Sequence, residues 1–227
     1  MRIGIIGAMQ MEVDALQAAM HNPASETVSG ITFVTGTIGS HEVTAAVCGI
    51  GKVFAAMCAQ TMILKYHPDA VINIGVAGTV TKGLQVLDIA IADKVCQHDM
   101  DTSPLGDPVG LISGINQIYF PADEALAAAI GAAADKLGCR NIRGTVASGD
   151  QFIHTQEKKD WIRETFGAIA AEMEGGSIGH VCTVNKVPFA VLRTISDGDG
   201  AAMDYATFAP KAAMQSIDVI METLKMM

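Results

Sequence analysis

Short apolar segments rich in valine, isoleucine and alanine alternate along the chain with longer segments in which apolar residues recur at helical spacing. We expect strands at Arg2–Gly7, Ile31–Ile38, Glu42–Cys48, Ala70–Ile74, Leu87–Val95, Ile142–Ala147, Ala168–Ala171 and Pro188–Ile195. We expect helices at Met11–Met20, Lys52–Tyr66, Asp123–Leu137, Met173–Asn185 and Phe208–Leu224. A short polar turn joins the second and third strands and favours a hairpin, whereas the later strand-then-helix order favours parallel pairing. The pattern therefore predicts a three-layer α/β/α sandwich with a central mixed, mostly parallel sheet.

The 227 residues suffice for one large α/β domain, and no linker, internal repeat or low-complexity tract divides them. We therefore expect a single domain over residues 1–227. Residues 75–79 are expected to form a loop after the fourth strand. The stretch 97–121 has little periodicity and several glycines and prolines, which is typical of a functional loop.

Charge and cysteine content limit the partners and the compartment. The net charge of −9 opposes attraction to a nucleic-acid backbone or an anionic membrane, but it allows a small nucleoside as ligand. The five cysteines are odd in number and never spaced as CxxC, which favours free thiols in a reducing compartment. The apolar N-terminus is short and soon followed by Glu12 and Asp14, so we expect a first strand there and no signal peptide. No apolar run approaches the ~20 residues that span a bilayer. We expect a cytoplasmic protein.

Ligands of open α/β sheets bind beyond the carboxyl ends of the strands, so the residues after each apolar segment are the functional candidates. They are Met9 and Glu12, Gly49–Gly51, Val76–Gly78, Ser148–Ile153, Glu172–Glu174 and Arg193–Asp197. Each has an ordinary structural explanation when taken alone. Asp197 and Glu174 suit the start of a helix, where carboxylates are favourable, and the glycines suit tight turns.

Three common motifs are missing or incomplete. The segment Gly4–Gly7 is not GxGxxG, so a dinucleotide fingerprint is unsupported. No Gly-x-Ser-x-Gly elbow of an α/β-hydrolase is present. His98, Asp99 and Asp101 lack a second pair of ligands at a metal-binding spacing.

The six strand-end segments together, in their order and spacing, resemble the 5′-methylthioadenosine/S-adenosylhomocysteine nucleosidases of the nucleoside phosphorylase superfamily. The matching segments are Ile3–Met9 with Glu12, Gly49–Val53, Ile72–Gly78, Ser148–Asp150 with Phe152 and Ile153, Glu172–Glu174, and Arg193–Asp197. The resemblance covers essentially the whole chain. It implies a nucleoside phosphorylase-like fold and hydrolysis of the N-glycosidic bond of methylthioadenosine and S-adenosylhomocysteine, in methionine salvage.

The family's catalytic roles match residues whose chemistry supports them. Purine departure needs a proton on the ring, and Asp197 resembles the general acid at N7, with Ser196 orienting it. Glu12 resembles the general base that activates water on the opposite face of the ribose, as in inverting glycosidases. Glu174 resembles the acceptor of hydrogen bonds from the ribose hydroxyls.

The resemblance also implies which residues bind the substrate. Phe152 would stack on the purine, the backbone of Ile153 would pair with the adenine edge, and Arg193 would lie near the attacking water. The remaining contacts are implied for Met9, Ile50, Ala77, Gly78, Met173 and Phe208. No metal or organic cofactor is implied, and a homodimer is expected, with the loop 97–121 near its interface.

Several positions depart from the family pattern. Val76 stands where many members have serine. Thr102, Leu105 and Asp107 replace apolar or aromatic residues that usually close the 5′ pocket. These changes leave the preferred 5′-substituent open, and 6-amino-6-deoxyfutalosine or 5′-deoxyadenosine stay alternative substrates.

Two other functional classes stay open. A purine nucleoside phosphorylase shares the expected fold but needs a cationic phosphate site, and this chain offers Met9 and Glu12 near the first strand instead. A nucleoside-binding protein without activity would have no need for both an acid and a base.

Overall fold

The computed structural model describes residues 1–198 and 202–227. Its first half contains β1 (Arg2–Gly7), the 3-10 turn η1 (Gln10–Glu12), α1 (Asp14–Ala18), β2 (His21–Val28), β3 (Ile31–Ile38), β4 (His41–Val47), α2 (Lys52–Tyr66), β5 (Ala70–Thr79), β6 (Ile89–Gln97) and η2 (Ser103–Leu105). The second half contains β7 (Tyr119–Pro121), α3 (Glu124–Lys136), β8 (Asn141–Ser148), α4 (Gln156–Phe166), β9 (Ala168–Glu172), α5 (Gly175–Asn185), β10 (Phe189–Asp197) and α6 (Ala202–Met226). None of the helices described is long and apolar enough to cross a membrane.

The described strands join in one sheet in the order β10-β6-β8-β9-β5-β1-β4-β3-β2, with β7 paired to β6. β1 runs parallel to β4 and β5, and β10 runs parallel to β5, whereas the β2–β3 and β3–β4 pairs are antiparallel. β10 pairs with both β5 and β6, and β9 pairs with the end of β5, so β5, β10, β6, β8 and β9 form a closed ring. The sheet is mixed, as predicted, and one half of it is curled.

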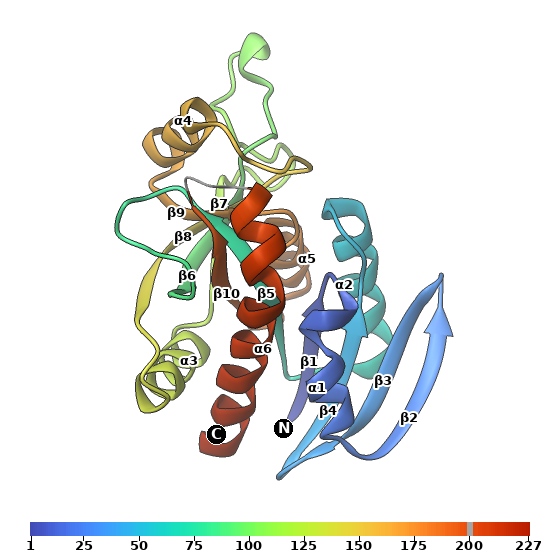
Figure 1. Ribbon diagram of the computed structural model, residues 1–227. Coiled ribbons are helices and arrows are strands. Elements are labelled where there is room, and N and C mark those ends of the chain that lie inside the picture. Colours follow the sequence, from blue (N-terminus) through green and yellow to red (C-terminus); the bar gives the residue numbers. More distant parts are fainter. Residues whose placement is uncertain (199–201) are drawn as a thin grey trace.

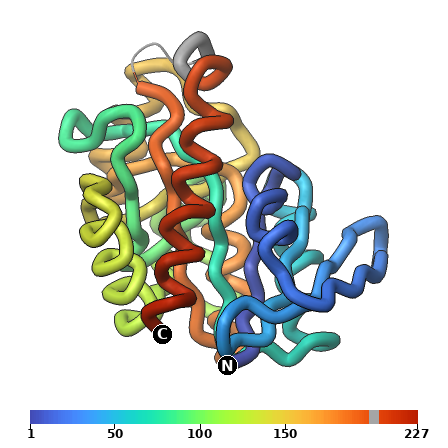
Figure 2. Tube along the Cα trace, turned by 60° about the horizontal axis from the view of Figure 1, so that its bottom comes forward, coloured from blue at the N-terminus to red at the C-terminus, as the bar shows by residue number. Residues whose placement is uncertain are grey.

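Helices cover both faces of the sheet (Figure 1). Ile3 and Ile5 of β1 pack in a core that includes side chains of α1, α3 and α6. Ile6, which points to the opposite face, packs in a second core with side chains of α2 and α5. The alternation follows from the period of two in a strand. Figure 2 shows α6 running along the sheet, with the two termini at the same end of the molecule. The three-layer α/β/α sandwich is thus confirmed.

Most predicted strands and helices lie within a few residues of their expected places, but two predictions near the site are wrong. The helix over Met11–Met20 is instead η1 followed by the short α1, because the Glu12 side chain turns back onto the backbone of Ala8 and Met9. Residues 75–79 are not a loop. They continue β5, since β10 and β9 supply hydrogen-bonding partners there.

The pattern missed β2, α4 and the three-residue strand β7, and it misplaced the start of two helices. β2 is an exposed edge strand with almost no apolar residues, and α4 buries only Lys159, Ile162 and Phe166. α5 begins at Gly175, after Met173, because Glu174 is its N-cap residue. α6 begins before Phe208, where the sequence predicted its start, and it runs through Pro210.

Candidate active site

A cavity of about 280 Å³ lies at the carboxyl ends of β1, β4, β5, β9 and β10. Its apolar wall consists of Ala8, Met9, Ile50, Val76, Ala77, Gly78, Phe152, Ala171, Met173 and Tyr205. Its polar groups are Glu12, Glu172, Glu174, Ser196 and Asp197. An apolar hollow with a few convergent polar groups is the usual form of a small-molecule site.

The structure brings most of the candidate residues together. Glu12, Ser196, Asp197, Met9, Ile50, Ala77, Gly78, Phe152, Met173 and Glu174 all line this cavity. Ile153, Arg193 and Phe208 do not. Ile153 packs in the apolar cluster beneath α4, Arg193 is fully buried, and Phe208 is half-buried on α6.

Glu12 is held in one orientation by backbone donors. The N–H groups of Ala8 and Met9 donate to its Oε2 at 2.7 and 2.9 Å, and the N–H of Val76 donates to Oε1 at 3.2 Å. Burial raises the pKa of Glu12, against the opposing effects of the Arg193 charge and these three hydrogen bonds. A fixed carboxylate with a raised pKa is suited to accept a proton.

Gly75 leaves room beside β5 for the side chains of both Glu12 and Arg193. A Cβ atom at residue 75 would lie 2.1 Å from Nη1 of Arg193 and 2.6 Å from Oε1 of Glu12. Both distances are far inside van der Waals contact, so a side chain cannot be accommodated unless one of the two charged groups moves. The glycine in the Ile74-Gly75-Val76 segment is therefore a requirement of the site and not only of the strand.

Two carboxylates on either side of Met173 have different surroundings. Glu172, at the end of β9, accepts from the N–H groups of Glu174 and Gly175 at 3.1 and 2.8 Å and from the hydroxyl of Ser148. Glu174 accepts at Oε1 from the N–H of Gly51 at 2.9 Å. Burial and the neighbouring Glu172 charge raise the pKa of Glu174 to about 7. Glu172 is therefore committed to the framework, whereas Glu174 keeps acceptor capacity toward the cavity.

Arg193 lies behind these carboxylates and not on the cavity wall. Its Nη2 donates to Glu172, to Oδ1 of Asn73 at 2.6 Å and to Oε2 of Glu174 at 3.4 Å, and its Nη1 donates to the carbonyl of Ile74 at 3.1 Å. A buried guanidinium is tolerable only when acidic partners balance its charge. Arg193 thus orients the carboxylates from behind.

Asp197 ends β10 and is 2% exposed. The hydroxyl of Ser196 donates to its Oδ1 at 2.9 Å. On the neighbouring strand, Gly78 leaves room for the carboxyl group, because a Cβ atom there would lie 2.8 Å from Oδ2. Asp197 and Glu12 therefore reach one cavity from β10 and from the turn after β1.

Two aromatic side chains, Phe152 and Tyr205, also border the cavity. Phe152 is 46% exposed, and its ring meets that of Tyr205 edge-on, with centroids 5.6 Å apart. The Tyr205 hydroxyl lies 3.3 Å from the sulfur of Met9. Sequence reasoning missed Tyr205 because it placed the start of the last helix beyond it. The sequence signal that could have found it is an aromatic residue three positions before Phe208, close to the predicted start of the helix.

Comparison with known proteins identifies the family. The model of the phosphorylase superfamily matches residues 2–225. A 5′-methylthioadenosine/S-adenosylhomocysteine nucleosidase of Shewanella piezotolerans is 37% identical, over 99% of each chain. The chain belongs to this nucleosidase family. The resemblance drawn from the sequence is confirmed.

Solved structures agree with this family. The nucleosidase of Neisseria meningitidis, in complex with methylthio-immucillin-A, has a TM-score of 0.95 at 31% identity and covers 100% of this chain and 99% of its own. The native futalosine hydrolase of Helicobacter pylori has a TM-score of 0.95 at 33% identity, with 100% and 98% coverage.

The positions at which this nucleosidase chain departs from the family pattern lie in two environments. Val76 is buried against Tyr205 and α6 at the cavity. Thr102 donates to Asp107 at 2.8 Å, and Leu105 is 83% exposed. None of these three loop residues lines the cavity within the single chain.

The weak metal motif of the nucleosidase sequence has a structural explanation. Asp99 accepts from Nζ of Lys52 at 2.6 Å and from the N–H of Asp150 at 2.9 Å. It thereby links the loops that carry Ile50 and Phe152. Within residues 1–198 and 202–227, no three His, Cys, Asp or Glu side chains are grouped as a metal site would require.

Proposed function

We propose that this chain hydrolyses the N-glycosidic bond of 5′-methylthioadenosine and S-adenosylhomocysteine, releasing adenine and the 5′-substituted ribose. The observation that carries the proposal is one largely apolar cavity that holds Asp197 with Ser196, Glu12 and Glu174. The Shewanella and Neisseria relatives bear the name of this activity.

Asp197 is proposed as the general acid. Its protonated carboxyl would donate to N7 of the purine, so that adenine leaves as a neutral base. Ser196 fixes the carboxyl through Oδ1, and Phe152 lies on the cavity wall where it can stack on the base. Proton transfer of this kind typically contributes ~10²–10⁴ in rate.

Glu12 is proposed as the general base, and Glu174 as the group that holds the ribose hydroxyls. Water activated by Glu12 would attack the anomeric carbon as the glycosidic bond breaks, and the proton from water would pass to the Glu12 carboxylate. The raised pKa of Glu12 supports this role. The roles of Arg193, Ile153 and Phe208 are then indirect, because none of them lines the cavity.

Water is favoured over phosphate by the charge of the cavity. No lysine or arginine belongs to the described lining, whereas the carboxylates of Glu12, Glu172 and Glu174 do, beside the proposed acid Asp197. A phosphate dianion would meet net repulsion there. The superfamily's phosphorolytic reaction is therefore the less favourable alternative for this cavity.

The test is release of adenine from methylthioadenosine by the purified chain, with and without inorganic phosphate. We expect equal rates and free 5-methylthioribose as the product. A rate that requires phosphate, with a ribose 1-phosphate product, would establish a phosphorylase. Binding of methylthioadenosine without adenine release, in either buffer, would establish a binding protein.

A second substrate is favoured by the structural similarity to the futalosine hydrolase of Helicobacter pylori. We include 6-amino-6-deoxyfutalosine in the same assay. Because the reacting purine and ribose are shared, the acid and base residues would be the same for both substrates. Only the 5′ end of the pocket would distinguish them.

We also propose a homodimer in the cytoplasm, acting in methionine salvage. The exposed face of α2 presents Val53, Phe54, Met57 and Leu64, which are 39–71% exposed, and this helix begins two residues after the cavity residue Ile50. An apolar face of this kind is typical of a surface that another subunit covers. Sedimentation of the purified chain tests the dimer.

The five free cysteines support a reducing compartment.

A further inference from the structure

Lys159 is a charged residue on the apolar face of a helix. In α4 the buried positions are Lys159, Ile162 and Phe166, and the last two pack in an apolar cluster against β8 and β9. Lys159 is 4% exposed, whereas its neighbour Lys158 lies over the ring of Trp161 at 4.1 Å. Burying an ammonium is costly unless it finds acceptors. The position of Lys159 is therefore set by a specific contact.

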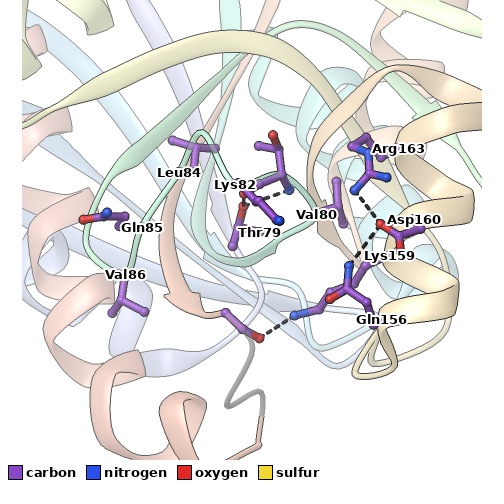
Figure 3. A pocket seen from close by; sticks show the side chains of 12 residues that line it. Thr79, Val80, Lys82, Leu84, Gln85, Val86, Gln156, Lys159, Asp160 and Arg163 are labelled. Carbon is purple, nitrogen blue, oxygen red and sulfur yellow. Dashed lines mark hydrogen bonds and ion pairs between the residues drawn. The ribbon is translucent and has the colours of Figure 1, made fainter.

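That contact is with the residue that follows Asp197. Nζ of Lys159 donates to the backbone carbonyl of Gly198. Figure 3 shows Lys159 extending from α4 into a second cavity, of about 680 Å³, between this helix and the segment that runs from Thr79, the last residue of β5, to Val86. Gly198 also borders this cavity. Asp197 lines the first cavity, so the Lys159–Gly198 bond holds the chain at the residue next to the proposed acid.

The pairing of β10 with β5 is irregular just before Asp197. The register shifts between Ile195 and Asp197 and resumes with Asp197 opposite Gly78, so the ladder is locally broken one residue before the proposed acid. Ser196 holds one carboxyl oxygen of Asp197, but it belongs to the same short segment. The charge-assisted bond from Lys159 ties this segment to a separate helix.

We propose that Lys159 is a positioning residue that fixes Gly198 and thereby aims the carboxyl group of Asp197 at the leaving base. The proposal rests on the proposed function of Asp197 as the general acid. Lys159 does not line the substrate cavity, so its effect must pass through Asp197. Binding of the ribose at Glu174 and of the base at Phe152 should stay unaffected.

The test compares Lys159→Met with Lys159→Arg and with the neighbouring control Lys158→Met. We expect Lys159→Met to lower kcat for methylthioadenosine about tenfold or more, since misplacement of a reacting group by ~1 Å can cost ~10² in rate. KM should stay within about threefold, which indicates retained ground-state binding. Lys159→Arg should recover most of kcat, and Lys158→Met should match the wild type. An unchanged kcat, or an equal loss for Lys158→Met, would overturn the proposal.

A double-mutant cycle with Asp197→Asn separates positioning of the acid from a general structural role. If Lys159 acts through the acid, Lys159→Met should lower kcat by less than about twofold in the Asp197→Asn background. The same tenfold loss in both backgrounds would refute positioning. If circular dichroism shows that Lys159→Met does not fold, the same double-mutant cycle is measured with Lys159→Gln. Wild-type turnover by the single variant Asp197→Asn would instead refute the role of Asp197 as the acid. That result is distinct from a failure of the positioning role of Lys159.

Discussion

Replacing Glu174 by glutamine should stabilise the protein at high pH. The Glu174 carboxyl has its pKa raised from 4.5 to about 7, first by burial and then by the Glu172 charge. Its ionised form is therefore disfavoured in the folded state. Each pKa unit corresponds to about 1.4 kcal/mol, so the difference of about 2.5 units, 7 minus 4.5, amounts to about 3 kcal/mol.

The sign follows from proton linkage. A raised pKa means that the folded state binds the proton more tightly than the unfolded chain does, so this stabilisation is present below pH 4.5 and is lost as pH rises through 7. The glutamine side chain has no proton to lose. Between pH 5 and pH 8 the free energy of unfolding of the wild type should thus fall by about 2–3 kcal/mol relative to Glu174→Gln.

The assay is denaturant unfolding of the substrate-free protein at pH 5, 6, 7 and 8, with thermal melting as a second readout. For a chain of this size, 2–3 kcal/mol corresponds to a relative shift in Tm of about 4–12 °C. The control is Glu157→Gln, an exposed carboxylate in the first turn of α4, which should show little pH dependence relative to wild type. A difference between Glu174→Gln and wild type that is constant from pH 5 to pH 8 would refute the reasoning.

Three further predictions concern activity. Asp197→Asn should lower adenine release by at least ~10², and Glu12→Gln should abolish it while an adenosine analogue still binds; near-wild-type turnover of both would exclude the proposed mechanism. Gly75→Ala should lower kcat by ~10² or more, because the new Cβ must displace Arg193 or Glu12; a crystal structure of the variant with both groups in place would contradict this. The ratio of kcat/KM for S-adenosylhomocysteine and methylthioadenosine should lie within about tenfold, and Asp107→Tyr should shift it toward methylthioadenosine; an unchanged ratio would show that the loop is remote from the pocket.

The sequence predicted those parts of the site that depend on where a strand ends. Glu12 and Asp197 both follow apolar strands, and parallel strands bring their carboxyl ends to one edge, so their common cavity could be expected. The sequence could not reveal that Arg193 points away from the cavity. Its side chain is directed by Glu172 and Asn73, and these contacts exist only once β5 has paired with both β9 and β10.

The missed elements share a physical reason. β2 is exposed along nearly its whole length, and α4 has a lysine where its apolar face would predict a hydrophobic residue. Periodicity reveals a strand or helix through the apolar side chains that it buries. An edge strand and a helix with a buried charge therefore both show only a weak hydrophobic pattern. The strand β5 was predicted too short for a different reason. Its glycines suggested a turn, although hydrogen-bonding partners on both sides keep the strand extended.

The closed ring of strands has a consequence for synthesis of the chain. β10, at residues 189–197, inserts between β5 and β6, which are complete about one hundred residues earlier. Until β10 leaves the ribosome, two apolar strands have open edges, and such edges invite association with other chains. The proposed acid lies on this last strand. A nascent or truncated chain that ends before residue 189 should therefore be an aggregation-prone intermediate for chaperones to hold, and not a smaller enzyme.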